Sequence, residues 1–236
     1  MSDVLRIGLP KGRVLAETCS LFREAGLDLG DLEKPTRRLI HEVETPHFGR
    51  FEVLILRAKD VPAYVEHGVC AFGVAGYDTL VEQRPNVLQP LDLAFGRCRV
   101  AIAHRVGIDP WRIEKPRIAT KFPRIAGDYF LSRGTPAQIV ELSGAIEIAP
   151  LVGLADAIVD IVETGETLRK NGLTEGETIF DVSARLIFNR ASLRLHMARL
   201  RAIQDALVEA LAVRTPTPTP TPTPTSARTN APMSAP

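Results

Sequence analysis

Residues Val159 to Leu173 read VDIVETGETLRKNGL, in which an apolar run passes through a small polar loop into a helical pattern. The run has the length of a buried strand, and the residues after Gly165 have the composition of a helix start. Strands joined to helices in this way are the building units of α/β folds. Ligands of such proteins collect at the carboxyl ends of the strands, so the loop is also a candidate binding site.

The loop ETGET (Glu163–Thr167) is typical of a phosphate site. Gly165 lets the backbone approach a ligand closely, the hydroxyls of Thr164 and Thr167 can donate, and free N–H groups at a helix start favour an anion. The acidic residues around the loop would suit the hydroxyls of a ribose on the same ligand; they are Asp160, Glu163 and Glu166. An ordinary turn is the alternative, because Thr-Gly pairs are common.

Short apolar runs alternate with helical patterns along the rest of the chain, which predicts an α/β architecture with mainly parallel sheets. We expect Asp78 to cap one of these helices, and the last helix to pack on the core rather than lie on a membrane surface. The expected strands are residues 5–9, 51–58, 70–77, 98–104, 117–122, 137–143 and 155–162. The expected helices are residues 14–25, 61–66, 78–83, 124–134 and 192–213.

Composition narrows the class of protein. The chain has 236 residues and a formal net charge of +1, so no long-range field favours a nucleic acid or a membrane as partner. The cysteines Cys19, Cys70 and Cys98 form neither a CxxC pair nor a zinc pattern, and we expect reduced thiols. The start MSDVLRIGLPKGR does not fit a signal peptide, so the predicted location is the cytoplasm.

The end of the chain differs in kind from the rest. From Thr215 threonine alternates with proline, and TSARTNAPMSAP follows. Every second residue of that repeat lacks an N–H and holds its predecessor extended, so neither a helix nor a ladder is possible there. We predict a disordered tail over residues 214–236, with a partner-binding PxxP segment as the alternative.

Basic residues follow two of the expected strands. Lys11 and Arg13 lie in LPKGRV, where the first strand turns into the first helix, and Arg57 ends the second strand. An arginine at that place needs an anion or a path to solvent. Arg37 is a further basic group, without a clear place in the pattern. Solvated loop charges are the alternative, but together the groups predict a polyanionic ligand held between two lobes.

Other kinds of site lack their motifs in this sequence. The histidines are scattered without an HExxH or similar spacing, and no GxSxG elbow is present. GLPKGR is not a Walker A loop, and GxGxxG does not occur.

Taken together, these segments resemble the ATP phosphoribosyltransferase family of histidine biosynthesis, in its short form. The strongest match is EIAPLVGLADAIVDIVETGETLRKNGL (Glu147–Leu173). The matches appear in the family's order and reach to about Leu211; the others are RIGLPKGRV, LRAKDVPAYVEHGVCAFGVAGYD, RIATKFP and FDVSARLIFNRAS.

The resemblance implies a reaction of two polyanions. Adenine N1 of ATP attacks C1 of 5-phosphoribosyl 1-pyrophosphate, and pyrophosphate leaves through an oxocarbenium-like state. The protein mainly positions the substrates and stabilises the leaving group. No general base is needed, because adenine N1 already carries a lone pair. Mg²⁺ is the implied cofactor, held largely by substrate oxygens.

The resemblance also implies roles for single residues. Arg57 and Arg37 would be catalytic, by stabilising the leaving pyrophosphate, and Lys11 and Arg13 would bind ATP. No side chain is assigned to a metal. The residues expected to bind phosphoribosyl pyrophosphate are Glu147, Asp156, Asp160, Glu163, Thr164, Gly165, Glu166, Thr167 and Leu168.

For the fold, the resemblance implies two α/β lobes with a cleft between them, similar to periplasmic binding proteins. The first lobe would comprise residues 1–95 and 184–213, and the second residues 96–183. Long members carry a C-terminal regulatory domain, for which the sequence after Val213 has no counterpart. The expected partner is therefore a separate regulatory subunit similar to a histidyl-tRNA synthetase, in a hetero-octamer.

Two other functions stay open from the sequence. The predicted phosphate loop would recognise only the phosphoribosyl half of the reaction, so the chain could be a phosphoribosyltransferase for another base. The same two-lobed cleft could also belong to a binding protein without catalysis.

Overall fold

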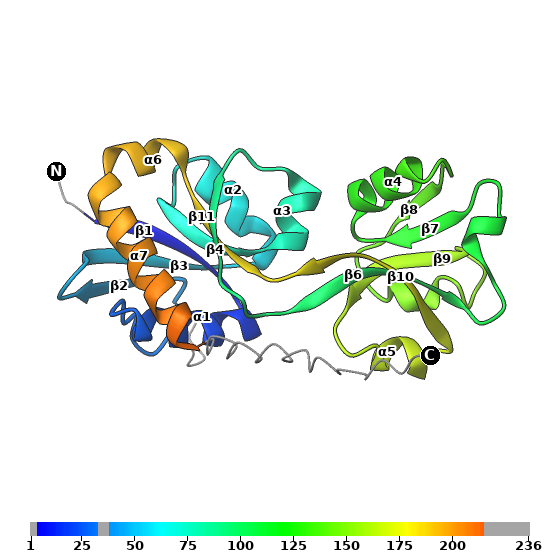
Figure 1. The fold of residues 1–236 in the computed structure, drawn as a ribbon, viewed down its shortest axis with the longest axis horizontal. Helices are drawn as coiled ribbons and strands as arrows, with labels where there is room; N and C mark the ends of the chain where they lie inside the picture. The colour runs from blue at the N-terminus through cyan, green and yellow to red at the C-terminus, as the bar shows by residue number, and fades with distance from the viewer. Residues whose placement is uncertain (1–3, 33–37, 215–236) are drawn as a thin grey trace, which may run out of the picture.

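The structure is a computed structural model that describes residues 4–32 and 38–214. Two sheets follow each other along the longest axis of the molecule, and each carries its own helices (Figure 1). The six-stranded sheet has the order β2-β3-β1-β4-β11-β5, and the five-stranded sheet has the order β10-β6-β9-β7-β8. The chain thus builds two lobes, and it enters the second lobe and returns from it.

The six-stranded sheet is the centre of the first lobe. Its strands are β1 (Leu5–Pro10), β2 (Ile40–Thr45), β3 (Gly49–Leu56), β4 (Phe72–Gly76), β5 (Leu88–Asp92) and β11 (Ala184–Phe188). β1 runs parallel to β3 and β4, and the remaining pairs are antiparallel. Phe72 lies between Phe51 and Phe188 in edge-to-face contacts, with ring centroids 6.3 and 6.1 Å apart. These rings anchor the core of this lobe.

Helices cover both faces of that sheet. They are α1 (Arg13–Glu24), the 3₁₀ turn η1 (Ala58–Asp60), α2 (Val61–Glu66), α3 (Tyr77–Gln83), α6 (Arg190–Leu195) and α7 (Met197–Arg214). α7 buries Leu200, Ile203, Leu207 and Ala210 at helical spacing. It therefore packs on the core, as its sequence predicts.

The five-stranded sheet forms the second lobe. Its elements are β6 (Cys98–Arg105), η2 (Pro110–Arg112), β7 (Arg117–Thr120), α4 (Pro123–Ser132), β8 (Gln138–Glu141), η3 (Ile146–Ile148), β9 (Ala157–Val162), α5 (Glu166–Lys170) and β10 (Leu173–Val182). Successive residues of β9 enter two separate apolar clusters, with Val159 in one and Ile158 in the other. Since alternate side chains of a strand point to opposite faces, this sheet is buried on both sides.

The two segments that cross between the sheets bind each other. The N–H of Leu93 donates to the carbonyl of Ala184, and the N–H of Ala184 donates to the carbonyl of Phe95, both at 2.9 Å. We propose lobe boundaries at 95/96 and 183/184, which the distribution of strands between the two sheets supports. Arg214, which the sequence analysis assigns to the tail, ends α7 and donates to Glu24 at 2.6 Å. Residues 215–236 lie outside the described residues.

A second set of contacts joins the lobes at α3 and α4. The carboxylate of Glu82 accepts from the backbone N–H groups of Arg124 and Ile125 at 3.0 and 2.9 Å. Arg84 forms an ion pair with Asp128 on the next turn of α4. The first-turn N–H groups of a helix have no partner within the helix, so Glu82 of one lobe satisfies donors of the other.

Three expectations about local structure are wrong. The sheets are mixed rather than mainly parallel, because β2, β5, β6, β10 and β11 pair in the antiparallel sense. Gly76, not Asp78, holds the N-cap position of α3, so Asp78 falls in its first turn. The expected helix 192–213 is divided at His196 into α6 and α7.

Two strands that the sequence did not predict, β5 and β10, have polar sequences. β10 (LTEGETIFDV) contains a glycine and five acidic or threonine positions, and β5 (LQPLD) contains a proline. Neither has a clean apolar alternation, so both depend on their neighbours in the sheet.

An alanine at Gly73 should destabilise the first lobe. Its Cβ would lie 2.6 Å from the backbone oxygen of Gly8 on β1 and 3.0 Å from Val61 of α2. The backbone oxygen cannot move without disturbing the ladder, so we expect a loss of about 1–3 kcal/mol in urea unfolding. Gly127→Ala in α4 is the matched control, because its Cβ meets nothing within 4 Å. The control should gain up to about 1 kcal/mol, and equal effects at both sites would contradict this account.

The pair of Arg117 and Asp156 should make the second lobe sensitive to acid. Asp156 accepts from the backbone N–H and the guanidinium of Arg117, with two contacts at 2.8 Å. These bonds lower the pKa of Asp156, chiefly through the side-chain bond from Arg117. The pair therefore stabilises the fold above the ordinary pKa of an aspartate, and this contribution is lost as pH falls through the lowered pKa.

We expect Asp156→Asn to lower the melting temperature at pH 7, and the difference from the wild type to shrink towards pH 3. Calorimetry across this range measures it. Asp205→Asn on the exposed side of α7 is the control and should leave the melting temperature unchanged at every pH. A difference that stays constant with pH would count against the ion pair as its cause.

Candidate active site

The loop after β9 lines a pocket. Gly165 adopts φ 71° at the N-cap of α5, in the left-handed region that favours glycine. The pocket encloses about 270 Å³. It is lined by Glu147, Asp160, Ile161, Val162, Glu163, Thr164, Gly165, Glu166, Thr167 and Leu168. The structure thus brings together every residue that the sequence analysis assigns to phosphoribosyl pyrophosphate except Asp156.

Asp156 lies at the other end of the strand. It precedes β9, whereas the loop follows it, and a six-residue strand spans about 20 Å. Its carboxylate binds Arg117 at the amino end of the parallel strands. The sequence alone does not show at which end of the strand a neighbouring residue lies relative to the pocket, because Asp156 and Glu163 are both only a few positions from the middle of β9.

Asp160 is an enclosed acid of the pocket, with 15% of its side chain exposed. Lys121 approaches it to 2.9 Å. The parallel register pairs Thr120 with Val159, so Lys121 follows β7 at the level of Asp160 on β9. Sequence reasoning did not single out Lys121, because the expected strand 117–122 included it, whereas β7 ends at Thr120.

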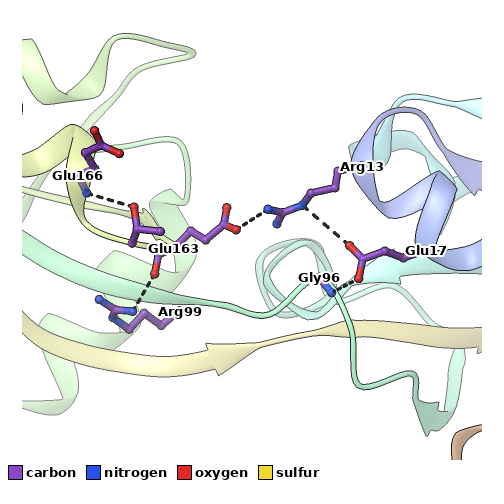
Figure 2. A network of polar contacts seen from close by, with 7 residues as sticks. Arg13, Glu17, Gly96, Arg99, Glu163 and Glu166 are labelled. Carbon is purple, nitrogen blue, oxygen red and sulfur yellow. Dashed lines mark hydrogen bonds and ion pairs between the residues drawn. The ribbon is translucent and has the colours of Figure 1, made fainter. Parts of the chain in front are cut away.

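Arg13 connects the first lobe to this loop. Its guanidinium forms an ion pair with Glu163 and lies 3.9 Å from Glu17, which in turn accepts from the N–H of Gly96 (Figure 2). The bond and charge of Glu163 raise the pKa of Arg13. Both side chains of the pair are more than half exposed, so the pair itself is weak. The phosphates of a ligand can therefore compete with Glu163 for Arg13.

Charged side chains from both lobes lie near Cys98, where the chain enters the second lobe. Burial raises the pKa of its thiol to about 11, and the nearby charges of Asp78, Arg13, Glu163 and Lys121 contribute with opposing signs. The thiol is therefore protonated at neutral pH. Burial also raises the pKa of Asp78, against the effects of Thr79 and Lys121. Asp78 thus lies within electrostatic range of Lys121 and Cys98.

Lys11 and Arg57 follow neighbouring parallel strands. The backbone N–H of Lys11 donates to the carbonyl of Leu56 at 2.8 Å, which places Arg57 beside it at the carboxyl edge of the first sheet. Both residues are exposed, so the solvent path that Arg57 requires is present. Arg37 lies outside the described residues. The carboxyl ends of β1 and β3 therefore present a basic edge to solvent.

No residues with the spacing of a metal centre occur in the ranges 4–32 and 38–214, where no three His, Cys, Asp or Glu side chains gather in a suitable cluster. The arrangement instead offers a pocket at a helix start on one lobe and basic side chains on the other. It can hold a ligand with two anionic ends, or two anionic ligands side by side.

Comparison with known proteins identifies the family. The family model described as HisG, ATP phosphoribosyltransferase, matches residues 57–211. ATP phosphoribosyltransferase 2 of Geobacter sulfurreducens is 46% identical over 88% of this chain and 98% of its own length. The ATP phosphoribosyltransferase of Sorangium cellulosum is 46% identical, with 90% and 98% covered.

Solved structures agree on the fold. The ATP phosphoribosyl transferase (HisG:HisZ) complex from Thermotoga maritima matches with a TM-score of 0.74 and 29% identity, over 89% of this chain and 99% of that one. A probable amino-acid ABC transporter extracellular-binding protein from Bacillus subtilis matches with a TM-score of 0.51 and 13% identity, over 91% and 97%, and shows the fold alone. The predicted two-lobed fold is confirmed. With relatives this similar over nearly their whole length, the chain belongs to the ATP phosphoribosyltransferase family.

Proposed function

We propose that the chain joins ATP to 5-phosphoribosyl 1-pyrophosphate, which gives N1-(5-phosphoribosyl)-ATP and pyrophosphate in the first step of histidine biosynthesis. The observation that carries the proposal is the contact of Arg13 with Glu163, because it brings the basic edge of one lobe onto the anion pocket of the other. A phosphoribosyl donor in that pocket would point its pyrophosphate towards Arg13, Lys11 and Arg57.

The pocket would hold the phosphoribosyl half. Thr164, Gly165 and Thr167 would bind the 5-phosphate through hydroxyl and backbone N–H groups. Asp160 would accept from the ribose hydroxyls, while Lys121 holds its carboxylate in place. The remaining members of this group are Glu147, Glu163, Glu166 and Leu168. Asp156 has no part in it.

The basic edge would hold the other charges. Lys11 and Arg13 would bind the phosphates of ATP, and Arg57, with Arg37, would stabilise the pyrophosphate as it leaves. Because negative charge builds up on the leaving group in the transition state, cations placed there lower the barrier more than they strengthen binding. Adenine N1 attacks with its own lone pair, so no side chain has to remove a proton.

A metal ion belongs to the reaction of this family, and we propose Mg²⁺. It would neutralise charge on the pyrophosphate. Mg²⁺ usually keeps few protein ligands, so substrate oxygens would hold most of the ion. Glu147 and Asp160 line the pocket and could add one carboxylate ligand.

Replacing Arg57 tests the proposed activity. We expect Arg57→Ala to reduce kcat by about a hundredfold or more, since one electrostatic stabiliser is lost. The assay follows the ultraviolet absorbance of an N1-substituted adenine, with ATP, phosphoribosyl pyrophosphate, Mg²⁺ and pyrophosphatase. Arg201→Ala on the exposed face of α7 is the matched control and should retain full activity.

The same assay separates the alternatives. A wild-type chain that transfers the phosphoribosyl group to another base and not to ATP would support the transferase class with a different acceptor. Phosphoribosyl pyrophosphate that binds without turnover, even with a regulatory subunit present, would support a binding protein instead.

We further propose a separate regulatory subunit and a hetero-octamer in the cytoplasm. The Thermotoga maritima relative was solved in a HisG:HisZ complex, and this chain covers 99% of that relative's chain. Over residues 4–32 and 38–214, no helix has both the length and the apolar character needed to cross a bilayer.

The partner can be tested with the purified chain and the histidyl-tRNA-synthetase-like protein of the same organism. Light scattering on a sizing column should give the mass of four chains and four partners. Histidine should inhibit the complex and leave the chain alone unaffected. Full inhibition of the isolated chain by histidine would contradict the proposal.

A further inference from the structure

Two arginines beneath the loop hold its backbone carbonyls. Arg99 of β6 donates from Nη1 to the carbonyl oxygen of Glu163 at 3.2 Å. Arg169 of α5 donates from Nη1 to the carbonyl oxygen of Thr164, also at 3.2 Å. In Figure 2 the carbonyl of Glu163 meets Arg99 while its side chain reaches out to Arg13. Two successive carbonyls at the start of the loop are therefore bound by cations.

Glu175 holds the first of these arginines. Its two carboxylate oxygens accept from Nε and Nη2 of Arg99, the latter at 2.6 Å. About two thirds of the Arg99 side chain and three quarters of that of Glu175 are buried. The bond from Arg99 lowers the pKa of Glu175, and the charge of Arg169 lowers it further. A planar two-bond pair of this kind fixes the orientation of the guanidinium as well as its position.

Glu175 and the second arginine both border the space under Gly165. A Cβ on Gly165 would lie 3.2 Å from Nη1 of Arg169 and 3.5 Å from Oε2 of Glu175. Both side chains thus fill the space directly below the glycine. The three residues form one layer, which we call the loop support: Arg99, Arg169 and Glu175.

The loop support comes from three separate elements. Arg99 lies near the start of β6, Arg169 in the single turn of α5, and Glu175 near the start of β10. The ladder of β10 with β6 is irregular just beyond Glu175, where the register shifts before Thr178. Bulges of this kind re-aim side chains beside active sites.

The chemistry of an anion site explains why carbonyls would be held in this way. A phosphate is repelled by carbonyl oxygens and attracted by N–H groups, so a phosphate loop must keep its carbonyls turned to other partners. Guanidinium groups on those carbonyls keep the peptide units oriented before the ligand arrives. A loop that is already ordered loses less entropy on binding.

We propose that Arg99, Arg169 and Glu175 are positioning residues that set the affinity for the 5-phosphate. This inference rests on the proposed function, because it assigns the phosphate of the phosphoribosyl group to the pocket. The residues act through the carbonyls of Glu163 and Thr164 and do not touch the substrate.

Calorimetric titration of three probes tests the inference. The probes are ribose 5-phosphate, pyrophosphate and phosphoribosyl pyrophosphate, each with Mg²⁺ and without ATP, on the chain alone and with its regulatory subunit. We expect Glu175→Gln, Arg99→Lys and Arg169→Lys to bind ribose 5-phosphate and phosphoribosyl pyrophosphate about tenfold more weakly. Pyrophosphate, which lacks the 5-phosphate, should keep its affinity.

Arg117→Lys is the matched control. Arg117 forms the same kind of two-bond pair with a carboxylate in the same lobe, but at the opposite edge of the strands. It should lower the melting temperature and leave the affinity for all three probes unchanged. In steady-state kinetics the support variants should raise KM for phosphoribosyl pyrophosphate and not KM for ATP. The double variant Arg99→Lys/Glu175→Gln should lose no more than the stronger single variant, since both break one pair.

The outcomes separate the two proposals. Wild-type chain that binds phosphoribosyl pyrophosphate, with support variants that bind ribose 5-phosphate equally well, would overturn the inference alone. So would an equal loss of affinity for pyrophosphate. A wild type that binds neither sugar phosphate would overturn the proposed function, and the inference with it. Arg169 is exposed, so the Arg169→Lys variant should fold and test the inference even if changes in the Arg99–Glu175 pair prevent folding.

Discussion

The hydrogen bonds between the two crossing segments are the constraint on which the site depends. Ala184 bonds to Leu93 on one side and to Phe95 on the other, so the two connections run as one paired ribbon between the sheets. The ribbon leaves the carboxyl edge of the first sheet facing the carboxyl edge of the second. Arg13 and Glu163 therefore meet although 150 residues separate them. The contact of Glu82 with the first turn of α4 supports the same arrangement from the far side.

The site carries both signs of charge, and two of its cations have a carboxylate beside them. Lys121 lies on Asp160 and Arg13 on Glu163, so part of the positive charge at the site is balanced locally. This explains how a chain with a net charge of +1 can bind strongly anionic substrates. The two pairs differ in depth, because Asp160 is mostly buried and Glu163 is not. The deeper pair suits a fixed group such as a ribose hydroxyl, and the shallower pair suits phosphates that arrive and leave.

Much of this could be predicted from the sequence. The strand, glycine and helix of residues 159–173 were expected from local pattern, and they form the pocket with the predicted lining. The antiparallel strands β2, β5, β10 and β11 could not be predicted, because their sequences are polar, broken by glycine or proline, or joined to a partner far along the chain. Asp156 was expected in the pocket because it is close to the loop in sequence, but the length of β9 separates it from the loop in space.

The sequence by itself determined the loop and the family. The loop was predictable because a left-handed glycine between a buried strand and a helix depends only on residues within a few positions of it. The family was predictable because matching motifs occur in order along nearly the whole chain. The tertiary structure alone decided which charges meet. Lys121 reaches Asp160 through the register of β7 on β9, and Arg99 reaches Glu175 across the irregular ladder of β6 and β10. Pairing of this kind depends on the order of strands in a sheet, and that order is settled by the packing of both faces of the sheet and not by any local pattern.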